Sequence, residues 1–105
     1  MPYIKEDIRK TLDDCIEYMV TSLSLNTENN IENLSNQDLL NISGNINYCF
    51  SRVIGKLINK PSYAKIAIMT GVLENIKQEF YRRVGVNLED KKILENGDIS
   101  EYGRL

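Results

Sequence analysis

The chain has 105 residues, of which 42% are hydrophobic and 27% charged, and its formal net charge is −2. This length predicts a single domain over residues 1–105, with a thin core that self-association would supplement. Because the sequence contains no His, it excludes Ser-His-Asp triads, histidine general bases and zinc sites built from imidazole.

The first predicted element is a helix over residues 5–25. Apolar side chains recur there at spacings of three and four, with charged residues between them, which is typical of one apolar stripe on an α-helix: Ile8, Leu12, Cys15, Ile16, Met19 and Leu23. Residues 26–34 show no such period and are predicted to form a loop.

Two further helices follow, separated by Lys60-Pro61-Ser62. Ser35 with Asp38 is a helix start signal, and an apolar stripe then continues to about Asn59. Proline disfavours the α region at the residue before it, so the second helix should end there, and Ser62 can cap a third helix. The third stripe runs from Ile66 to Val84, and Gly85 is expected to close it in the left-handed cap conformation.

The remaining residues predict a short helix and a tail. Residues 87–96 can form a fourth helix with Asn87 as its cap and Gly97 after it, and residues 98–105 are expected to be a tail. No strand alternation is present. The predicted fold class is therefore all-α, an antiparallel three-helix bundle with a short fourth helix and a C-terminal tail.

The second and third predicted helices each have a second face, opposite the core stripe, that carries small residues. Glycine costs about 0.5 to 1 kcal/mol in a helix relative to alanine, which indicates close backbone approach at these positions. We expect another copy of the chain to pack there, making a homo-oligomer; the alternative is that residues 87–105 fold back over the same surface. The predicted interface consists of Gly44, Ser51, Gly55, Ala64, Ile68, Gly71, Val72 and Asn75.

The distribution of charge and the two cysteines restrict the classes of ligand and the cellular location that we expect. Residues 35–86 carry a net charge of +4 between acidic ends of −4 and −2, which suits a small anionic ligand but lacks the basic stripe of a nucleic-acid-binding protein. Cys15 and Cys49 lie in apolar helical patterns, with neither metal-ligand nor disulfide-framework spacing, so reduced core cysteines and a cytoplasmic location are expected. No apolar run is long enough for a signal peptide or a membrane span.

Six residues are candidates for binding such a ligand. Arg82 and Arg83 could hold a phosphate, Tyr48 and Tyr81 could stack on a base, and Asn47 and Glu79 could provide polar specificity. The structural alternative is that cations in the last turn of a helix complement its dipole and that the tyrosines only pack.

A magnesium-dependent nucleotide pyrophosphohydrolase is the enzyme worth weighing for an all-α chain. It needs carboxylate pairs at spacing three or four on two facing helices. Asp14 and Glu17 supply one pair, but Glu74 and Glu79 are five apart, about 140° around a helix. The pattern is not met, so no metal, no cofactor and no catalytic residue are predicted.

Several motifs resemble a family of small helical proteins encoded by bacteriophages and prophages. They are Met-Pro-Tyr-Ile at the start, Gly44-Asn-Ile-Asn-Tyr48, Tyr63, Gly71-Val-Leu-Glu74, Glu79-Phe-Tyr-Arg-Arg83, Glu89-Asp-Lys-Lys and Asn96-Gly-Asp98. The resemblance implies no established activity. It favours proteins that act by binding in the cytoplasm of a bacterial host: sequestering a defence signal, blocking a host protein or serving the virion.

These observations lead to one functional hypothesis and one alternative. The first is a non-enzymatic, homo-oligomeric binding protein that counters host defence by capturing a nucleotide-type signalling molecule. The alternative is a protein-interaction module that inhibits a host protein or serves the virion.

Overall fold

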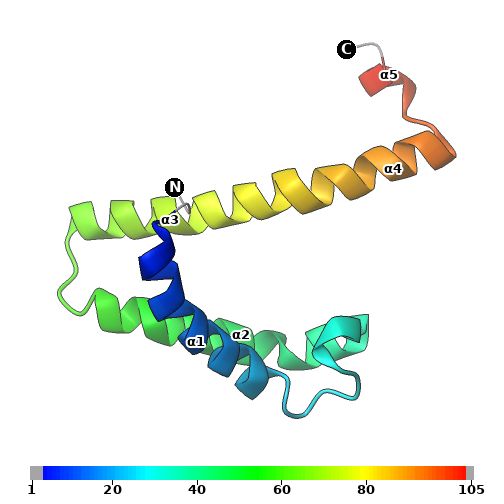
Figure 1. The fold of residues 1–105 in the computed structure, drawn as a ribbon. Coiled ribbons are helices and arrows are strands. Elements are labelled where there is room, and N and C mark those ends of the chain that lie inside the picture. The colour runs from blue at the N-terminus through cyan, green and yellow to red at the C-terminus, as the bar shows by residue number, and fades with distance from the viewer. Residues whose placement is uncertain (1–3, 104–105) are drawn as a thin grey trace. The chain divides into compact units, whose positions relative to one another are not determined.

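The computed structural model describes residues 4–103, and within that range every regular element is helical (Figure 1). The predicted all-α class is therefore confirmed. In chain order the elements are α1 (Glu6–Leu23), a 3₁₀ turn η1 (Ile31–Asn33), α2 (Asn36–Leu57), α3 (Tyr63–Phe80), a π-helical turn η2 (Tyr81–Gly85), α4 (Val86–Asn96) and α5 (Ser100–Gly103).

The chain divides into two compact units, Met1–Lys60 and Pro61–Leu105. The boundary coincides with the predicted break at Pro61. α2 ends at Leu57 and α3 begins at Tyr63, with the Ser62 hydroxyl accepting a hydrogen bond from the Lys65 N–H at 3.2 Å. The Ser62 cap is thus confirmed, and it supplies an acceptor to one of the unpaired N–H groups at the helix start.

In the first unit, α1 begins with Glu6 and Asp7, acidic residues that complement the positive end of the helix dipole. It ends two residues earlier than predicted. The Ser24 hydroxyl and the Ser24 N–H both donate to the Val20 carbonyl, at 2.9 and 3.1 Å. The N–H bond is the last of the helical pattern, and the hydroxyl bond is a local side-chain contact of the kind that competes with helix continuation.

The connection between α1 and α2 is held to the start of α2 by one carboxylate. Asp38 accepts hydrogen bonds from the Glu28 N–H, the Asn29 amide and the Ser35 N–H, at 3.0, 2.9 and 3.0 Å. The Ser35 hydroxyl in turn accepts from the Asp38 N–H, which completes a capping box and confirms the predicted helix start. The predicted loop is therefore anchored at Glu28 and Asn29, a contact that the loop's lack of periodicity did not reveal.

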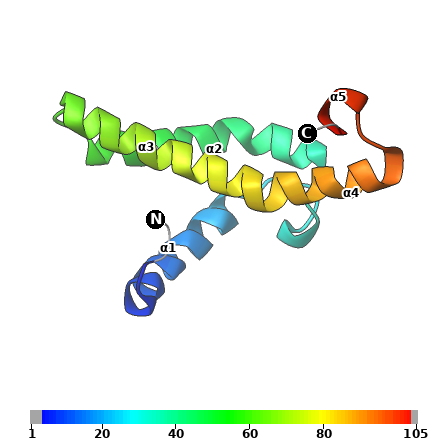
Figure 2. The ribbon, with the colours of Figure 1, turned by 90° about the horizontal axis from the view of Figure 1, so that it is seen from above.

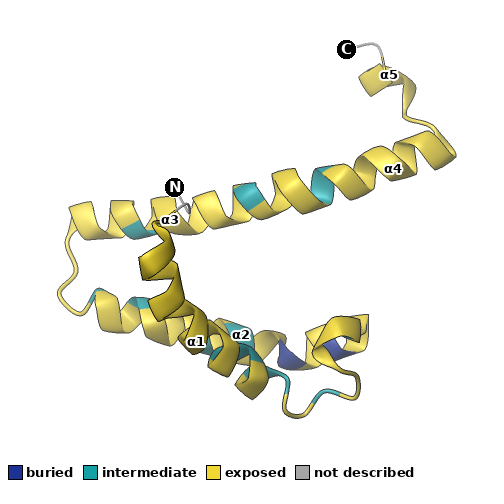
Figure 3. Ribbon diagram, viewed as in Figure 1, coloured by how far each residue is buried: buried dark blue, intermediate teal, exposed yellow. Residues whose placement is uncertain are grey.

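These bonds make Asp38 an electrostatically distinct group. The Ser35 N–H, the Asn29 amide and the Glu28 N–H lower the pKa of its carboxyl from 3.8 to about 2. Donors that bond the ionised form favour it, which is the physical reason for the direction. Asp38 is 2% exposed and Ile42, one turn later, is 6% exposed; they are the two buried residues among residues 4–103 (Figure 3).

In the second unit the predicted break after the third helix is wrong, because α3 runs through η2 into α4 without a change of direction (Figure 2). Gly85 has φ −64° and ψ −48°, so it is right-handed helical and not a left-handed cap. Asn87 is not an N-cap either, since its side-chain amide donates to the Arg83 carbonyl at 2.6 Å from inside the helix. Gly97, with φ 85°, is the residue that ends α4 as predicted, and α5 lies in the predicted tail.

The apolar stripes have the predicted spacing, but most of their side chains are exposed (Figure 3). Ile8, Leu12 and Ile16 on α1 are exposed, and so are Leu73 and Phe80 on α3. Both cysteines are free thiols; Cys49 is half-buried and Cys15 is exposed, so its expected core position is wrong. Ile8, Leu12 and Ile16 of the same stripe are exposed like Cys15, whereas Met19 and Leu23, toward the end of α1, are half-buried. Among residues 4–103, no helix combines the length and the apolar character that a membrane crossing requires.

Candidate ligand site

An open depression lies along one face of α2, at the position of the predicted second face. Its volume is about 740 Å³, within the range of roughly 300 to 1,000 Å³ usual for small-ligand sites. All of its walls come from one stretch of α2 and the residues just after it: Tyr48, Ser51, Arg52, Gly55, Lys56 and Asn59. One helix therefore positions the whole site, and its register does not depend on a second element.

Tyr48 and Arg52 are joined across one helical turn. The Arg52 Nη1 donates to the Tyr48 hydroxyl at 3.1 Å, and the guanidinium carbon lies 5.8 Å from the ring centroid. The hydrogen bond to Tyr48 raises the pKa of Arg52. Residues four apart share a helix face, and a cation over an aromatic ring is attracted by the ring quadrupole. The pair thus places an aromatic surface, 61% exposed at Tyr48, next to a fixed positive charge.

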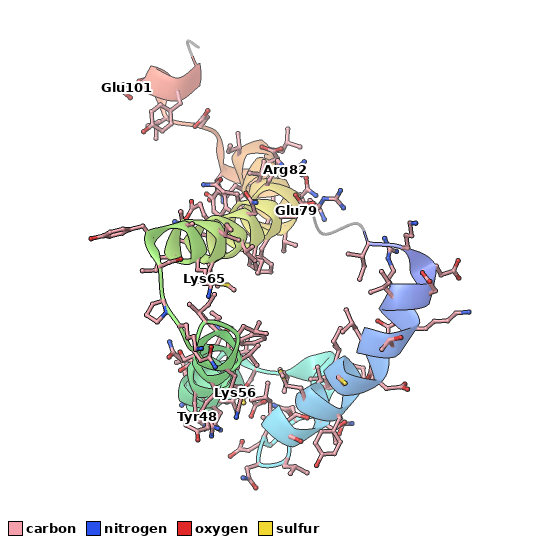
Figure 4. All side chains as sticks on the ribbon, turned by 90° about the vertical axis from the view of Figure 1, so that its left-hand side faces the viewer. Tyr48, Lys56, Lys65, Glu79, Arg82 and Glu101 are labelled. Atoms are coloured by element: carbon pink, nitrogen blue, oxygen red, sulfur yellow. The ribbon has the colours of Figure 1, made fainter. Side chains whose placement is uncertain are left out.

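Gly55 and Lys56 belong to the same depression, and Figure 4 labels Tyr48 and Lys56 on α2. A Cβ built on Gly55 would meet no atom within 4 Å, and the same holds for Gly44 on the preceding turns. The absence of a side chain therefore leaves backbone accessible beside Tyr48. Asn47 borders the depression, since its side-chain oxygen accepts a hydrogen bond from the Ser51 hydroxyl at 3.3 Å.

The second group of candidate residues gathers in the other unit, around Glu79 (Figure 4). Its two carboxylate oxygens each accept from one arginine: Arg82 Nη2 at 2.7 Å and Arg83 Nε at 2.7 Å. The Glu79 side chain is 26% exposed, and those of Arg82 and Arg83 are 66% and 57% exposed. The cluster carries a net positive charge, and exposed ion pairs of this kind are worth only about 0 to 1 kcal/mol, so an anion can compete for the arginines.

Tyr81 points to a different set of neighbours. Its hydroxyl donates to the Glu89 carboxylate at 2.5 Å, and this bond raises the pKa of Tyr81. A Cβ built on Gly85 would lie 2.8 Å from the Tyr81 Cδ2, so the ring lies directly against the Gly85 backbone. One side of the Tyr81 ring is therefore covered by its own helix.

The structure thus brings the predicted residues together in two groups. Tyr48, Ser51 and Gly55 line one depression, with Asn47 at its border, whereas Glu79, Arg82 and Arg83 form one charge cluster. The remaining predicted interface residues lie on α3 and are exposed: Ala64, Ile68, Gly71, Val72 and Asn75. Gly71, like Gly44, has no atom near the position of a Cβ.

Sequence reasoning missed Arg52 and Lys56, which supply the positive charge of the depression. The available signal was their spacing of four and eight residues from Tyr48, which places all three on one helix face.

Comparison with known proteins identifies a family. Neither the curated proteins nor the solved structures contain a match to this chain. One family model matches residues 1–99, which is nearly the whole sequence. The chain therefore belongs to the family described as "Domain of unknown function (DUF6899)".

Proposed function

We propose that this protein is a non-enzymatic, homo-oligomeric binding protein that captures a small anionic molecule of the nucleotide type. The observation that carries the proposal is the Tyr48–Arg52 pair, an exposed ring held next to a guanidinium in an open depression. A base can stack on the ring, because every base has a π-face. Arg52 and Lys56 then provide charge for a phosphate.

The arginines of the second unit support the same ligand class. Arg82 and Arg83 lie side by side on one carboxylate, which keeps two guanidinium groups in register for the oxygens of a phosphate. In this proposal the phosphate displaces Glu79 from one or both of them. Tyr81 then offers the side of its ring that Gly85 does not cover.

Self-association is part of the proposal because of what lies on the glycine-bearing faces. Gly44, Gly55 and Gly71 all have open space where a Cβ would be, and Ile68 and Val72 beside Gly71 are exposed. A second copy could approach these backbones closely and cover the apolar side chains. We further propose that the three long helices pack as an antiparallel bundle through their apolar stripes, which would bury Ile16 and Leu73.

The biological setting is proposed from the motifs of the sequence. Gly44-Asn-Ile-Asn-Tyr48 and Glu79-Phe-Tyr-Arg-Arg83 resemble proteins of bacteriophages and prophages. The first segment contributes Tyr48 to the depression on α2. The second contributes Glu79, Arg82 and Arg83 to the charge cluster. In this setting the protein acts in the cytoplasm of a bacterial host and counters defence by withdrawing a nucleotide signal.

The experiment is calorimetry of the full chain with linear and cyclic nucleotides and cyclic ADP-ribose isomers, combined with light scattering. We expect one class of nucleotide to bind to an oligomer. Tyr48→Ala and Arg52→Ala should weaken binding, whereas Lys10→Ala, which removes a charge from α1, should leave it unchanged. A monomer that binds none of these molecules would refute the proposal.

The exposed apolar side chains favour a second candidate, a protein-interaction module that blocks a host protein or serves the virion. Tyr63 on α3 and Leu94 on α4 are exposed almost completely, and apolar surface of this kind marks protein contacts when it is contiguous. A pull-down should then recover one stoichiometric partner that is lost with Gly71→Leu. Because nothing lies within 4 Å of a Cβ at Gly71, this variant should keep its helices.

A further inference from the structure

An open pocket of about 470 Å³ in the first unit is lined by both cysteines of the chain. α1 and α2 contact each other within this unit. The pocket is lined by Asp14, Cys15, Tyr18, Met19 and Ser22 of α1 and by Cys49 of α2. It shares no residue with the Tyr48 depression, and the proposed nucleotide binding makes no use of it.

Three of the lining residues carry sulfur. Cys15 and Met19 are four residues apart, so they lie on the same face of α1, and Cys49 adds a second thiol from α2. Both cysteines are free thiols. Apolar atoms make up nearly all of the accessible wall. The donor atoms that these two helices contribute to the pocket are therefore mainly soft, polarisable sulfurs.

We propose that Cys15, Cys49 and Met19 form a binding site for a soft monovalent metal ion of the Cu(I) or Ag(I) type. Thiolate and thioether sulfur select such ions over hard cations. Magnesium and calcium require several oxygen ligands, and no group of three or more His, Cys, Asp or Glu residues that could hold an ion occurs in residues 4–103.

The binding step exchanges protons for metal. Each thiol releases its proton to water, and its sulfur donates an electron pair to the ion. The Met19 thioether donates a third pair and releases no proton. No electron is transferred, so the ion keeps its +1 charge and no oxidant or reductant is needed.

The exposure of the three sulfur-bearing side chains allows a metal ion to reach the proposed site. Cys15 is exposed and provides the side from which an ion enters, whereas Cys49 and Met19 are half-buried. Two thiolates and one monovalent ion leave a single negative charge, which water at the Cys15 side can solvate. Because the ion joins α1 to α2, it should stabilise the folded unit by mass action.

The test uses the reduced full chain under anaerobic conditions, with Ag(I) as the first probe and chelator-buffered Cu(I) as the second. We expect one ion per chain by native mass spectrometry, about two protons released per ion, and loss of thiol labelling at both cysteines. Cys15→Ser and Cys49→Ser should each lose the high-affinity site, and Met19→Leu should weaken it. Met69→Leu on α3 is the matched control and should bind as the unmodified chain does.

Two results would overturn the proposal. Two ions per chain, with each cysteine variant keeping one, would show that the thiols bind independently. A doubling of mass on metal addition would show that thiols of different chains are bridged. Cys49→Ala, which suits a half-buried position, is measured beside Cys49→Ser. If both variants lose metal binding while their helical circular dichroism is unchanged, the loss is assigned to the missing thiol.

Discussion

The ring of Tyr81 lies where a side chain on Gly85 would have to be: a Cβ at Gly85 would stand 2.8 Å from the Tyr81 Cδ2. The same ring ends in a hydroxyl that donates to Glu89 at 2.5 Å. Tyr81 therefore spans the π-helical turn and connects its first residue to the first turn of α4. Gly85 is needed here for space and not for a positive φ, since its dihedral angles are helical.

Gly85→Ala should displace the Tyr81 ring and break its bond to Glu89. That bond raises the pKa of Tyr81, so the variant should lower the pKa toward its ordinary value of 10.0. The measurement is a spectrophotometric titration of the phenols, with Tyr81→Phe used to assign the component. Gly71→Ala adds the same methyl group in open space and should leave this titration unchanged. If the unmodified chain, Gly85→Ala and Gly71→Ala all titrate alike, the prediction is contradicted.

Asp38 should make the first unit sensitive to acid. Its pKa is lowered from 3.8 to about 2, so its contribution to stability is complete above the unfolded value of 3.8 and is lost as pH falls toward 2. Asp38→Asn should flatten the dependence of the melting temperature on pH between these values and lower the melting temperature at neutral pH. Asp13→Asn, on the exposed side of α1, should keep the acid dependence, and identical curves for the two variants would refute the assignment.

Ser35 should contribute separately as the helix cap. Its hydroxyl accepts from the Asp38 N–H at 3.0 Å, and replacement of such a cap by alanine costs about 1 kcal/mol. Ser35→Ala should therefore lower the free energy of unfolding by about this amount, as measured by urea denaturation. Ser43→Ala is the control, because the Ser43 hydroxyl donates to a carbonyl within α2 and caps nothing; an equal loss in both variants would contradict the capping role.

Local chemistry explains which parts of the fold were predictable. The starts of α2 and α3 depend on bonds between Ser35 and Asp38 and between Ser62 and Lys65, which are three residues apart, so sequence patterns reveal them. The continuation through Gly85 depends on how one tyrosine ring packs, and glycine alone is compatible with either outcome. Burial was less predictable than the helix boundaries, because a stripe such as that of α1 shows which face is apolar but not what covers it.

In the candidate site, too, some features were predictable from the sequence and others were not. Projection of the sequence onto a helix was sufficient to place Tyr48, Ser51 and Gly55 together. It did not reveal that Arg52 bonds to Tyr48, because that bond depends on two side-chain rotamers. The engagement of Arg82 and Arg83 by Glu79 also depends on side-chain conformation, although spacings of three and four residues permit it.

Tyr48 should contribute to ligand binding through its ring more than through its hydroxyl. Tyr48→Phe keeps the stacking surface and the cation–π contact with Arg52 but removes the 3.1 Å hydrogen bond. We expect Tyr48→Phe to retain most of the nucleotide affinity. Tyr48→Ala should lose about 1 to 3 kcal/mol of binding free energy, the usual value of a base–aromatic stack. Calorimetry distinguishes these outcomes, and equal losses in the two variants would assign the effect to the hydroxyl.

Glu79 competes with any anion for Arg82 and Arg83, so its neutralisation should strengthen phosphate binding at this cluster. In Glu79→Gln the two 2.7 Å ion pairs are lost, and an exposed pair is worth up to about 1 kcal/mol, or about fivefold in affinity. The measurement is titration with inorganic pyrophosphate at low salt. Glu74→Gln removes the same charge from α3, where Glu74 pairs with Lys77 at 4.0 Å. This control variant corrects for net charge, and an equal gain in both variants would mean that the arginines are not the phosphate site.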